Sequence, residues 1–152
     1  KRGLSRASRR VESKVKDRRS THMQNVRLTD DVTLSRVIAG CMRIADGKLA
    51  GDALLGFTRQ CMALGIDTFD HAPVYGGYTC EKLFGDAVLR REPALRGKMK
   101  LITKTGIVLP NRHGNGRIYY DASKKAILAE MDESLERLGT DHVDVLLVHT
   151  SL

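Results

Sequence analysis

The chain has 152 residues, of which 41% are hydrophobic and 29% are charged, a composition typical of one globular domain rather than of a fibrous or low-complexity chain. No apolar run approaches the roughly 20 residues that a membrane-spanning helix needs. The cysteines Cys41, Cys61 and Cys80 show neither metal-ligand nor redox spacing. We therefore expect free thiols, no bound metal, and a cytoplasmic protein without a membrane span.

The net charge of +8 belongs almost entirely to the beginning of the chain. Residues 1–22 hold nine Lys and Arg and two acidic residues, a charge of +7, whereas residues 23–152 hold seventeen against sixteen, a charge of +1. We treat residues 1–22 as a disordered basic tail, because so few apolar residues cannot bury a core. A nucleic-acid arm, an anionic-membrane patch and the remnant of a transit peptide stay open for it, but nucleic acid is not the partner that we expect.

From Met23 onward the apolar pattern alternates between strands and helices. Strands are expected at residues 26–29, 32–35, 36–41, 67–70, 101–104 and 143–149, and helices at residues 48–64, 79–91 and 122–138. The first two strands would form a hairpin with a two-residue turn at Asp30 and Asp31, and residues 109–119 would form a loop. The remaining order, β-α-β-α-β-α-β, predicts an α/β fold with a parallel sheet.

The sequence predicts both the start and the buried face of the helix at residues 122–138. We expect Asp121 to cap the last helix. One face of that helix would be formed by apolar side chains, namely Ile127, Leu128, Met131, Leu135 and Leu138.

The first parallel strand argues against a dinucleotide-binding fold of the doubly wound kind. Such a fold would have a G-x-G-x-x-G loop after that strand, whereas only Gly40 stands there.

Four side chains with useful chemistry fall at or just after the carboxyl ends of predicted parallel strands: Asp70, Tyr75, Lys104 and His149. In a barrel of alternating strands and helices, catalytic residues occupy that edge. An ammonium about 4 Å from a phenol stabilises the phenolate by roughly 4 kcal/mol at an effective dielectric constant near 20. Each residue alone is more simply a turn, a cap or a solvated strand end, but together they suit the protonation of an oxyanion, which hydride delivery to a carbonyl creates.

Several segments of the sequence resemble the aldo-keto reductases. They are the predicted hairpin, the motif Gly-Ile-Asp-Thr-Phe-Asp-His-Ala-Pro-Val-Tyr-Gly at residues 65–76, the strand at residues 101–104 and the segment at residues 141–149. The variant at residues 70–78, followed by Cys80 and Glu81, is similar to a bacterial-type subgroup of oxidoreductases. The resemblance covers about residues 24–149 and implies a (β/α)8 TIM barrel that binds NADPH and reduces small aldehydes and ketones.

The resemblance also implies roles for individual residues. Tyr75 would be the general acid and Lys104 would help it to give up its proton. Asp70 would be the partner of the lysine, and His149 would orient the substrate carbonyl. The residues implied near the nicotinamide are Gly40, Cys41, Met42 and Asp70. Many family members carry an aromatic residue where this chain has Met42, so the wall of the substrate pocket would differ here.

A closed eight-stranded barrel takes about 250 residues, whereas the pattern here supplies four parallel strands. We therefore expect the N-terminal half of the barrel, a truncated domain at residues 23–152, with sheet edges that favour self-association. Its activity without a second half stays open. The alternatives are a non-enzymatic subunit of the same fold that senses the cofactor, and an inert fragment.

Polar residues outside this set receive structural interpretations. We expect His71 and Cys80 to be buried, with a redox role for Cys80 as the alternative. Arg112, His113 and Arg117 are expected in a solvated loop, with contact to a substrate or partner as the alternative.

Overall fold

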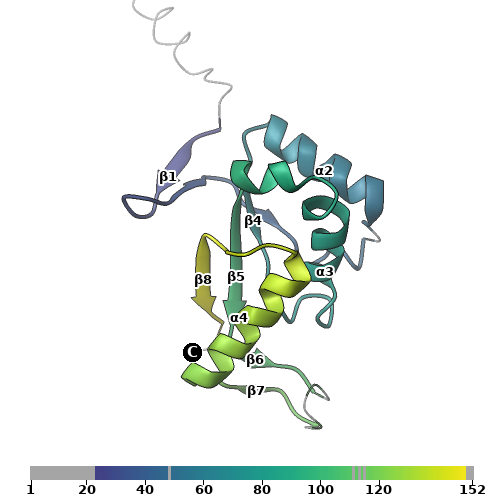
Figure 1. The fold of residues 1–152 in the computed structure, drawn as a ribbon, viewed down its shortest axis with the longest axis vertical. Helices are drawn as coiled ribbons and strands as arrows, with labels where there is room; N and C mark the ends of the chain where they lie inside the picture. Colours follow the sequence, from purple (N-terminus) through teal and green to yellow (C-terminus); the bar gives the residue numbers. More distant parts are fainter. Residues whose placement is uncertain (1–22, 48, 111, 113, 115, 150–152) are drawn as a thin grey trace, which may run out of the picture.

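The structure is a computed structural model that describes residues 23–47, 49–110, 112, 114 and 116–149. The predicted tail at residues 1–22 lies outside the described residues, as do Lys48 and His113. The strands are β1 (Asn25–Arg27), β2 (Thr33–Ser35), β3 (Ala39–Gly40), β4 (Thr68–Asp70), β5 (Lys100–Thr105), β6 (Ile107–Val108), β7 (Tyr119–Tyr120) and β8 (Val145–Val148). The helices are α2 (Gly51–Ala63), α3 (Cys80–Phe84) and α4 (Lys124–Leu138), with the shorter helical segments η1 (Gly85–Leu89) and η2 (Pro93–Lys98) (Figure 1).

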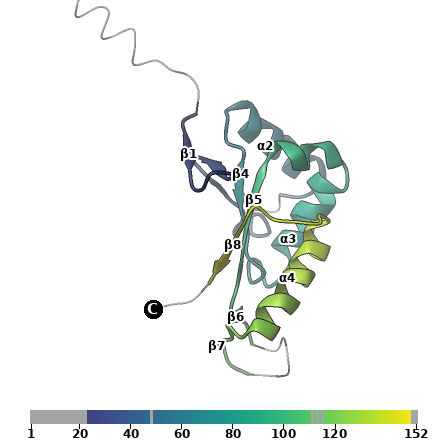
Figure 2. The ribbon, with the colours of Figure 1, turned by 60° about the vertical axis from the view of Figure 1, so that its left-hand side comes forward.

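A four-stranded parallel sheet in the order β3-β4-β5-β8 forms the centre of the fold. Helices α2, α3 and α4 lie on one side of this sheet (Figure 2). This arrangement confirms the predicted α/β alternation, since each parallel connection must cross one face of the sheet before the chain can form the next strand. Because the strands run in one direction, their carboxyl ends share one edge of the sheet.

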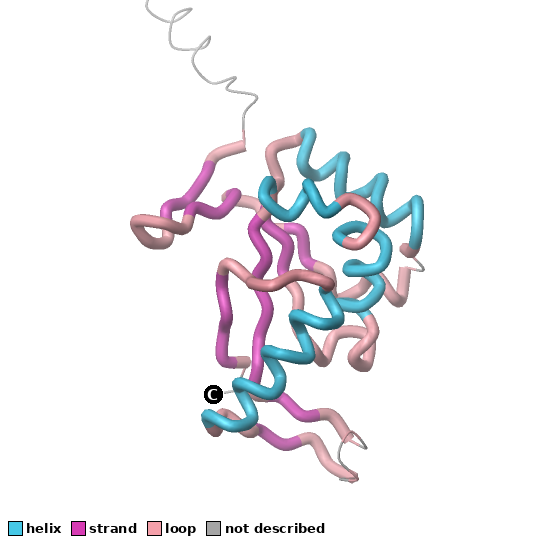
Figure 3. Tube along the Cα trace, in the orientation of Figure 1, coloured by secondary structure: helices cyan, strands magenta, loops and turns pink. Residues whose placement is uncertain are grey.

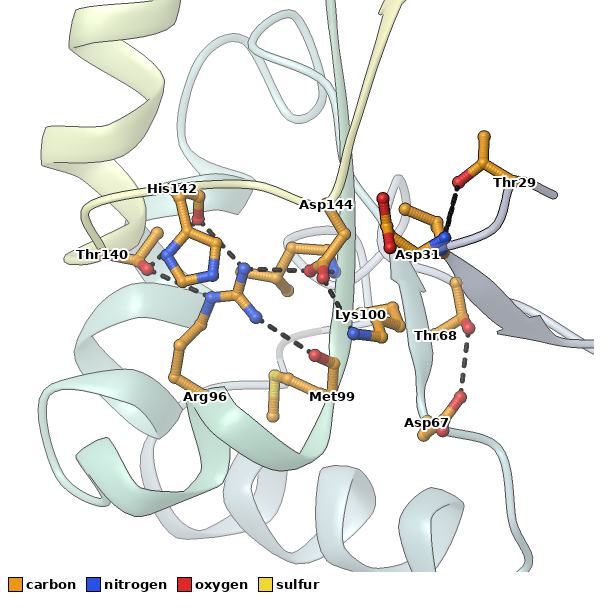
Figure 4. Close-up of polar contacts among 12 residues, drawn as sticks. Thr29, Asp31, Asp67, Thr68, Arg96, Met99, Lys100, Thr140, His142 and Asp144 are labelled. Carbon is orange, nitrogen blue, oxygen red and sulfur yellow. Dashed lines mark hydrogen bonds and ion pairs between the residues drawn. The ribbon is translucent and has the colours of Figure 1, made fainter. Parts of the chain in front are cut away.

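The N-terminal hairpin is confirmed, but its turn is longer than predicted. β1 and β2 pair antiparallel, with Val26 opposite Leu34, and residues 28–32 connect them. The hydroxyl of Thr29 accepts hydrogen bonds from the backbone N–H groups of Asp31 (3.3 Å) and Val32 (3.0 Å), and the first contact is drawn in Figure 4. This side-chain-to-backbone turn takes up residues that the apolar pattern had assigned to strands.

The first parallel strand is shorter than predicted, because only Ala39 and Gly40 pair with β4. Upstream of them, a different contact joins the hairpin to β4. The backbone N–H of Ser35 donates to the Thr68 hydroxyl at 2.9 Å, and the N–H of Thr68 donates to the Ser35 hydroxyl at 3.2 Å. These two bonds replace strand pairing, and Val37 and Ile38 stay exposed.

The hydrophobic core lies between the sheet and the helices. Phe69 of β4 and Leu101 of β5 point into it, and both are fully buried together with Phe84 of α3 and Leu138 of α4. The rings of Phe69 and Phe84 lie 5.4 Å apart between centroids. Side chains alternate along a strand, so Asp70 and Lys104 belong to the opposite face of the sheet.

The helices differ from the predicted ones at three points. The helix predicted at residues 79–91 becomes α3 followed by a π-helical segment, η1. Ser123 rather than Asp121 is the N-cap of α4, and its hydroxyl accepts from the N–H of Ala126 at 3.2 Å. Asp121 instead accepts from the N–H of Ser123 at 2.9 Å. The buried positions of α4 are Glu130, Ser134 and Leu138, whereas Leu128 of the predicted apolar face is 55% exposed.

An ion-pair cluster closes the amino-terminal edge of the sheet (Figure 4). One carboxylate oxygen of Asp144 accepts from Arg96 and from the N–H of Leu101, both at 2.9 Å, and the other lies 3.1 Å from Lys100 Nζ. Burial alone would raise the pKa of Asp144, but the Leu101 hydrogen bond and the two cations hold this pKa below its usual range. The cluster joins the segment before β8 to the start of β5.

A second small hairpin, β6 with β7, extends beyond the carboxyl end of β5 (Figure 3). It takes up the end of the loop predicted at residues 109–119, since Tyr119 pairs with Val108. Among the described residues, no helix combines the length and the apolar character needed to cross a bilayer.

Candidate active site

Three of the predicted catalytic side chains form one hydrogen-bonded group at the carboxyl edge of the sheet. Lys104 Nζ lies 2.6 Å from Asp70 Oδ1 and 2.9 Å from the Tyr75 hydroxyl oxygen. The Tyr75 hydroxyl lies 3.2 Å from the second carboxylate oxygen of Asp70. Each member of the group therefore contacts the other two.

Strand register accounts for the meeting of Asp70 and Lys104. Asp70 ends β4 and pairs with Ile102 of β5, so that Lys104 lies two residues further on, on the same face of the sheet. The third N–H of the ammonium donates to the carbonyl oxygen of His71 at 2.8 Å. With only 12% of the lysine side chain exposed, these three acceptors fix the position of its charge.

Tyr75 lies on the loop that follows β4, where the chain turns sharply. Its N–H donates to the carbonyl oxygen of Ala72 at 3.1 Å, and Gly76 comes next with a positive φ of 59°. A Cβ atom at Gly76 would approach the Cys80 sulfur to 2.7 Å. Only glycine combines that backbone angle with that close approach, so the Gly76 turn directs the chain from Tyr75 into α3.

His149 follows β8 and completes the predicted set. Its N–H donates to the carbonyl oxygen of Thr105 at 2.6 Å. The imidazole stands nearly perpendicular to the Tyr75 ring, at 87°, with 6.3 Å between the ring centroids. Burial lowers the pKa of His149 and the nearby Lys104 charge lowers it further, while Asp70 partly opposes them. This direction favours the neutral imidazole, which can donate one N–H without a positive charge.

The residues predicted near a nicotinamide line an open part of the same edge. Gly40 pairs with Asp70 in the sheet, and apart from its chain neighbours no described residue lies within 4 Å of the place that a Cβ would occupy on it. Met42 is 53% exposed, whereas Cys41 is buried, and burial raises the pKa of its thiol. Gly40 and Met42 can therefore meet a ligand, while Cys41 offers only its backbone.

His71 is buried, as expected, and its backbone also takes part in the hydrogen-bonded group. Its backbone carbonyl accepts a hydrogen bond from Lys104, a contact that the sequence pattern does not predict. Its ring packs on Phe84 with 4.6 Å between centroids, and neither ring nitrogen has a hydrogen-bond partner among the described residues. Burial and the Lys104 charge lower the pKa of His71 to about 3.

The remaining candidates fall outside the group. The thiols Cys41, Cys61 and Cys80 are free and buried, and burial raises the pKa of Cys80. Arg112 is not a solvated loop residue, because only 14% of its side chain is exposed. In the part of the chain that the structure describes, no group of three His, Cys, Asp or Glu residues could hold a metal ion.

The fold and this edge are those of half a (β/α) barrel with a polar site at the carboxyl ends of its strands. The model of the aldo/keto reductase family matches residues 36–151. The chain belongs to the aldo/keto reductase family.

Individual relatives agree with this membership. The chain is 46% identical over 129 residues to the uncharacterized oxidoreductase YcsN of Bacillus subtilis, covering 84% of this chain and 43% of the relative. It is 42% identical over 130 residues to a 6-dehydroglucose reductase of Agrobacterium fabrum, with the same two shares. The holo form of aldo-keto reductase AKR11C1 from Bacillus halodurans superposes with a TM-score of 0.68 at 29% identity, covering 86% of this chain and 41% of that chain.

The chain thus spans less than half the length of the curated relatives it matches. Its four parallel strands and N-terminal hairpin correspond to part of the TIM barrel of the matched structures, which confirms the predicted fold class. Both of these curated relatives carry names of oxidoreductases.

Proposed function

We propose that this chain carries the catalytic group of an NADPH-dependent carbonyl reductase, which reduces a small aldehyde or ketone to an alcohol. The observation that carries the proposal is the triangle of Asp70, Tyr75 and Lys104, with His149 beside the tyrosine ring. The name of the 42% identical relative, a 6-dehydroglucose reductase, supports a carbonyl substrate. The buried free thiols support a reducing compartment such as the cytoplasm.

The hydrogen bonds of the group support Tyr75 as the proton donor. All three N–H bonds of Lys104 have acceptors, so the ammonium donates to the tyrosine oxygen and the tyrosine keeps its own proton to give. In the free site that proton can point to Asp70. A substrate oxygen beside Tyr75 would offer it a second acceptor.

Proton transfer from Tyr75 leaves negative charge on its oxygen, 2.9 Å from the Lys104 ammonium. Because the site is partly buried, this attraction is stronger than in water. Asp70 balances the lysine charge before substrate binds. The neutral His149 would donate an N–H to the carbonyl oxygen and so orient it toward Tyr75.

A bound nicotinamide cofactor would supply the hydride that adds to the carbonyl carbon. Gly40 and Met42 fit a flat ring at this edge, since the space over Gly40 is open and Met42 is exposed. Asp70 lies beside Gly40 in the sheet and would border the same ring, with Cys41 contributing its backbone. The carbonyl gains the hydride at carbon and the Tyr75 proton at oxygen, and solvent later returns a proton to Tyr75.

The test is consumption of NADPH by the full chain with 4-nitrobenzaldehyde as the carbonyl probe. We expect Tyr75→Phe to lower kcat by about 10²- to 10⁴-fold, the range of a lost general acid. Tyr120→Phe is the matched control, because Tyr120 is 51% exposed on β7, and it should leave kcat unchanged. Equal rates for the wild-type chain and Tyr75→Phe would overturn the proposal.

A further inference from the structure

Tyr78, three residues after the proposed proton donor, has a strained backbone. Among the described residues it is the one non-glycine residue with a positive φ, 71°, and it follows Gly76 at 59° and Gly77 at 62°. A side chain with a Cβ atom rarely adopts this conformation. Such a conformation persists where the surrounding contacts hold it, so the contacts of Tyr78 explain why it is tolerated.

The Tyr78 side chain contacts the segment that follows β5. Its hydroxyl accepts a hydrogen bond from the N–H of Leu109 at 3.0 Å. The guanidinium carbon of Arg112 lies 4.0 Å from the centroid of its ring, a cation–π contact. Leu109 and Arg112 lie between β6 and β7, so these contacts tie the Tyr75 loop to the hairpin that follows β5, the strand that carries Lys104.

Arg112 is itself fixed from the other side by α4. Its Nη1 lies 2.9 Å from the Glu130 carboxylate, and its Nη2 donates to Glu133. The hydrogen bond to Glu133 and the ion pair with Glu130 fix the guanidinium, whose flat face stacks on the tyrosine ring. The strained loop is therefore held by a rigid group rather than by a mobile surface side chain.

A series of polar contacts connects Glu133 of α4 to β5. Glu133 also accepts from Arg137 at 3.0 Å, and Arg137 donates to Glu81 at 2.8 Å. Glu81 as a whole is 1% exposed. Its other carboxylate oxygen accepts a hydrogen bond from the Thr103 hydroxyl at 2.6 Å. Thr103 precedes Lys104, so the helix that follows the Tyr75 loop is attached to β5 directly beside the lysine.

We propose that Tyr78 is a positioning residue, whose clamp on Leu109 and Arg112 holds the Tyr75 hydroxyl against Lys104 and Asp70. The clamp acts through the loop and does not itself touch the reacting atoms. The catalytic consequence of this inference rests on the proposed function. Its structural part concerns only how firmly the loop at residues 73–79 is held in place. The two parts can therefore be measured separately.

The structural part is tested by amide hydrogen exchange of the full chain, followed in peptides that cover residues 73–79. Tyr78→Gly removes the ring but accepts the positive φ, so the variant should fold. We expect exchange in this loop to rise at least about tenfold. Arg112→Met should have the same effect through loss of the stacked cation. Arg59→Met is the matched control, since Arg59 pairs with Glu92 on the surface away from the loop.

The catalytic part is tested by kcat and KM with NADPH and 4-nitrobenzaldehyde. Tyr78→Gly should lower kcat about 10- to 100-fold with KM for both probes nearly unchanged, because a misplaced donor affects the reaction more than binding. Tyr78→Phe keeps the ring on Arg112 and loses only the bond to Leu109, so it should recover most of kcat. Tyr120→Phe again should have no effect.

The outcomes separate the two proposals. Unchanged exchange at residues 73–79 in both Tyr78→Gly and Arg112→Met overturns the clamp. Raised exchange with unchanged kcat, while Tyr75→Phe abolishes turnover, overturns the positioning role and leaves the reductase proposal standing. A folded chain that never turns over the probes overturns the proposed function and, with it, the catalytic part of the clamp.

Discussion

At the scale of single residues, the proposed mechanism depends most on Lys104. Its ammonium donates to Asp70, Tyr75 and the carbonyl of His71 within 2.9 Å. Methionine has a similar length and no charge, so Lys104→Met keeps the packing and removes the electrostatic support of the Tyr75 oxygen. We expect kcat with NADPH and 4-nitrobenzaldehyde to fall by about 10²-fold or more.

Lys100→Met provides the matched control for this prediction. Lys100 is also on β5 but points to Asp144 at the opposite end of the sheet. A small loss of stability with normal kcat is expected for it. If Lys104→Met retained normal kcat, the ammonium would have no part in catalysis.

His71 gives the protein a specific weakness in acid. Its folded-state pKa of about 3 lies below the ordinary histidine value of 6.5, so between these pH values the unfolded chain binds a proton that the folded chain does not. The free energy of unfolding therefore falls as pH falls below 6.5, by up to about 1.4 kcal/mol per pH unit from this group. His71→Leu should remove this part of the slope in urea unfolding measured from about pH 7 to about pH 4.

Asp144 acts in the same direction, because a carboxylate with a lowered pKa loses its stabilising effect in acid. The difference in slope between the wild-type chain and His71→Leu isolates the histidine from it. Identical slopes in the two proteins would mean that His71 is protonated, or solvated, in the folded state.

At the scale of elements, Gly85 marks the closest approach between two helical segments. It begins η1, and a Cβ atom there would lie 2.3 Å from the carbonyl oxygen of Arg137 and 2.6 Å from that of Leu138. Because both neighbours are backbone atoms of α4, they cannot move without shifting the helix. We expect Gly85→Ala to lower the free energy of unfolding by about 1–3 kcal/mol.

Gly56→Ala is the control, with the opposite sign. Gly56 lies inside α2, and beyond the backbone of that helix no described residue lies within 4 Å of the place that a Cβ would occupy on it, so alanine should stabilise the helix by about 0.5–1 kcal/mol. Both free energies are to be measured by chemical denaturation at neutral pH. Equal effects of the two substitutions would contradict the close contact of η1 with α4.

The positions of the strand-end residues could be predicted from the sequence, because an apolar run marks each buried strand and the first polar residue after it marks the end of that strand. Asp70, Lys104 and His149 follow such runs directly, and Tyr75 follows one within a Pro and Gly loop. Strand alternation and register then bring Asp70 and Lys104 together without further information. The roles of these residues rest on the proposed mechanism.

Other features could not be read from apolar periodicity, because polar contacts decide them. The pattern placed Leu128 in the buried face of α4, whereas Glu130 and Ser134 occupy that face, held there by ion pairs and hydrogen bonds. The pattern likewise predicted Asp121 as the N-cap, whereas Ser123, two residues later, is the N-cap in the structure. The Tyr78–Arg112 contact joins two residues that are distant in the sequence, and no local signal predicts it.

At the scale of the molecule, the parallel sheet has two outer strands. In the described part of the chain β3 and β8 each pair on one side only, and Leu146, Leu147 and Val148 of β8 are 40% to 57% exposed. Exposed apolar edge strands favour association with another chain. A preparation of these 152 residues should therefore show a concentration-dependent mass above that of one chain in analytical ultracentrifugation.

A charge on this edge should oppose the association. Leu147→Lys introduces a repulsive cation on both copies at once, and we expect it to shift the population toward the single chain. Leu64→Lys is the matched control, because Leu64 is 67% exposed at the end of α2. A wild-type chain that stays a monomer at all concentrations would contradict this prediction.

The central claim is that Tyr75 protonates a carbonyl oxygen while a hydride reaches its carbon on this chain. The most direct measurement uses NADPH deuterated at C4 and follows deuterium into the alcohol formed from 4-nitrobenzaldehyde. We predict one deuterium per molecule of product with the wild-type chain and almost no product with Tyr75→Phe. A labelled alcohol formed equally well by both proteins would contradict the role of Tyr75, and an alcohol without deuterium would contradict hydride transfer from the cofactor.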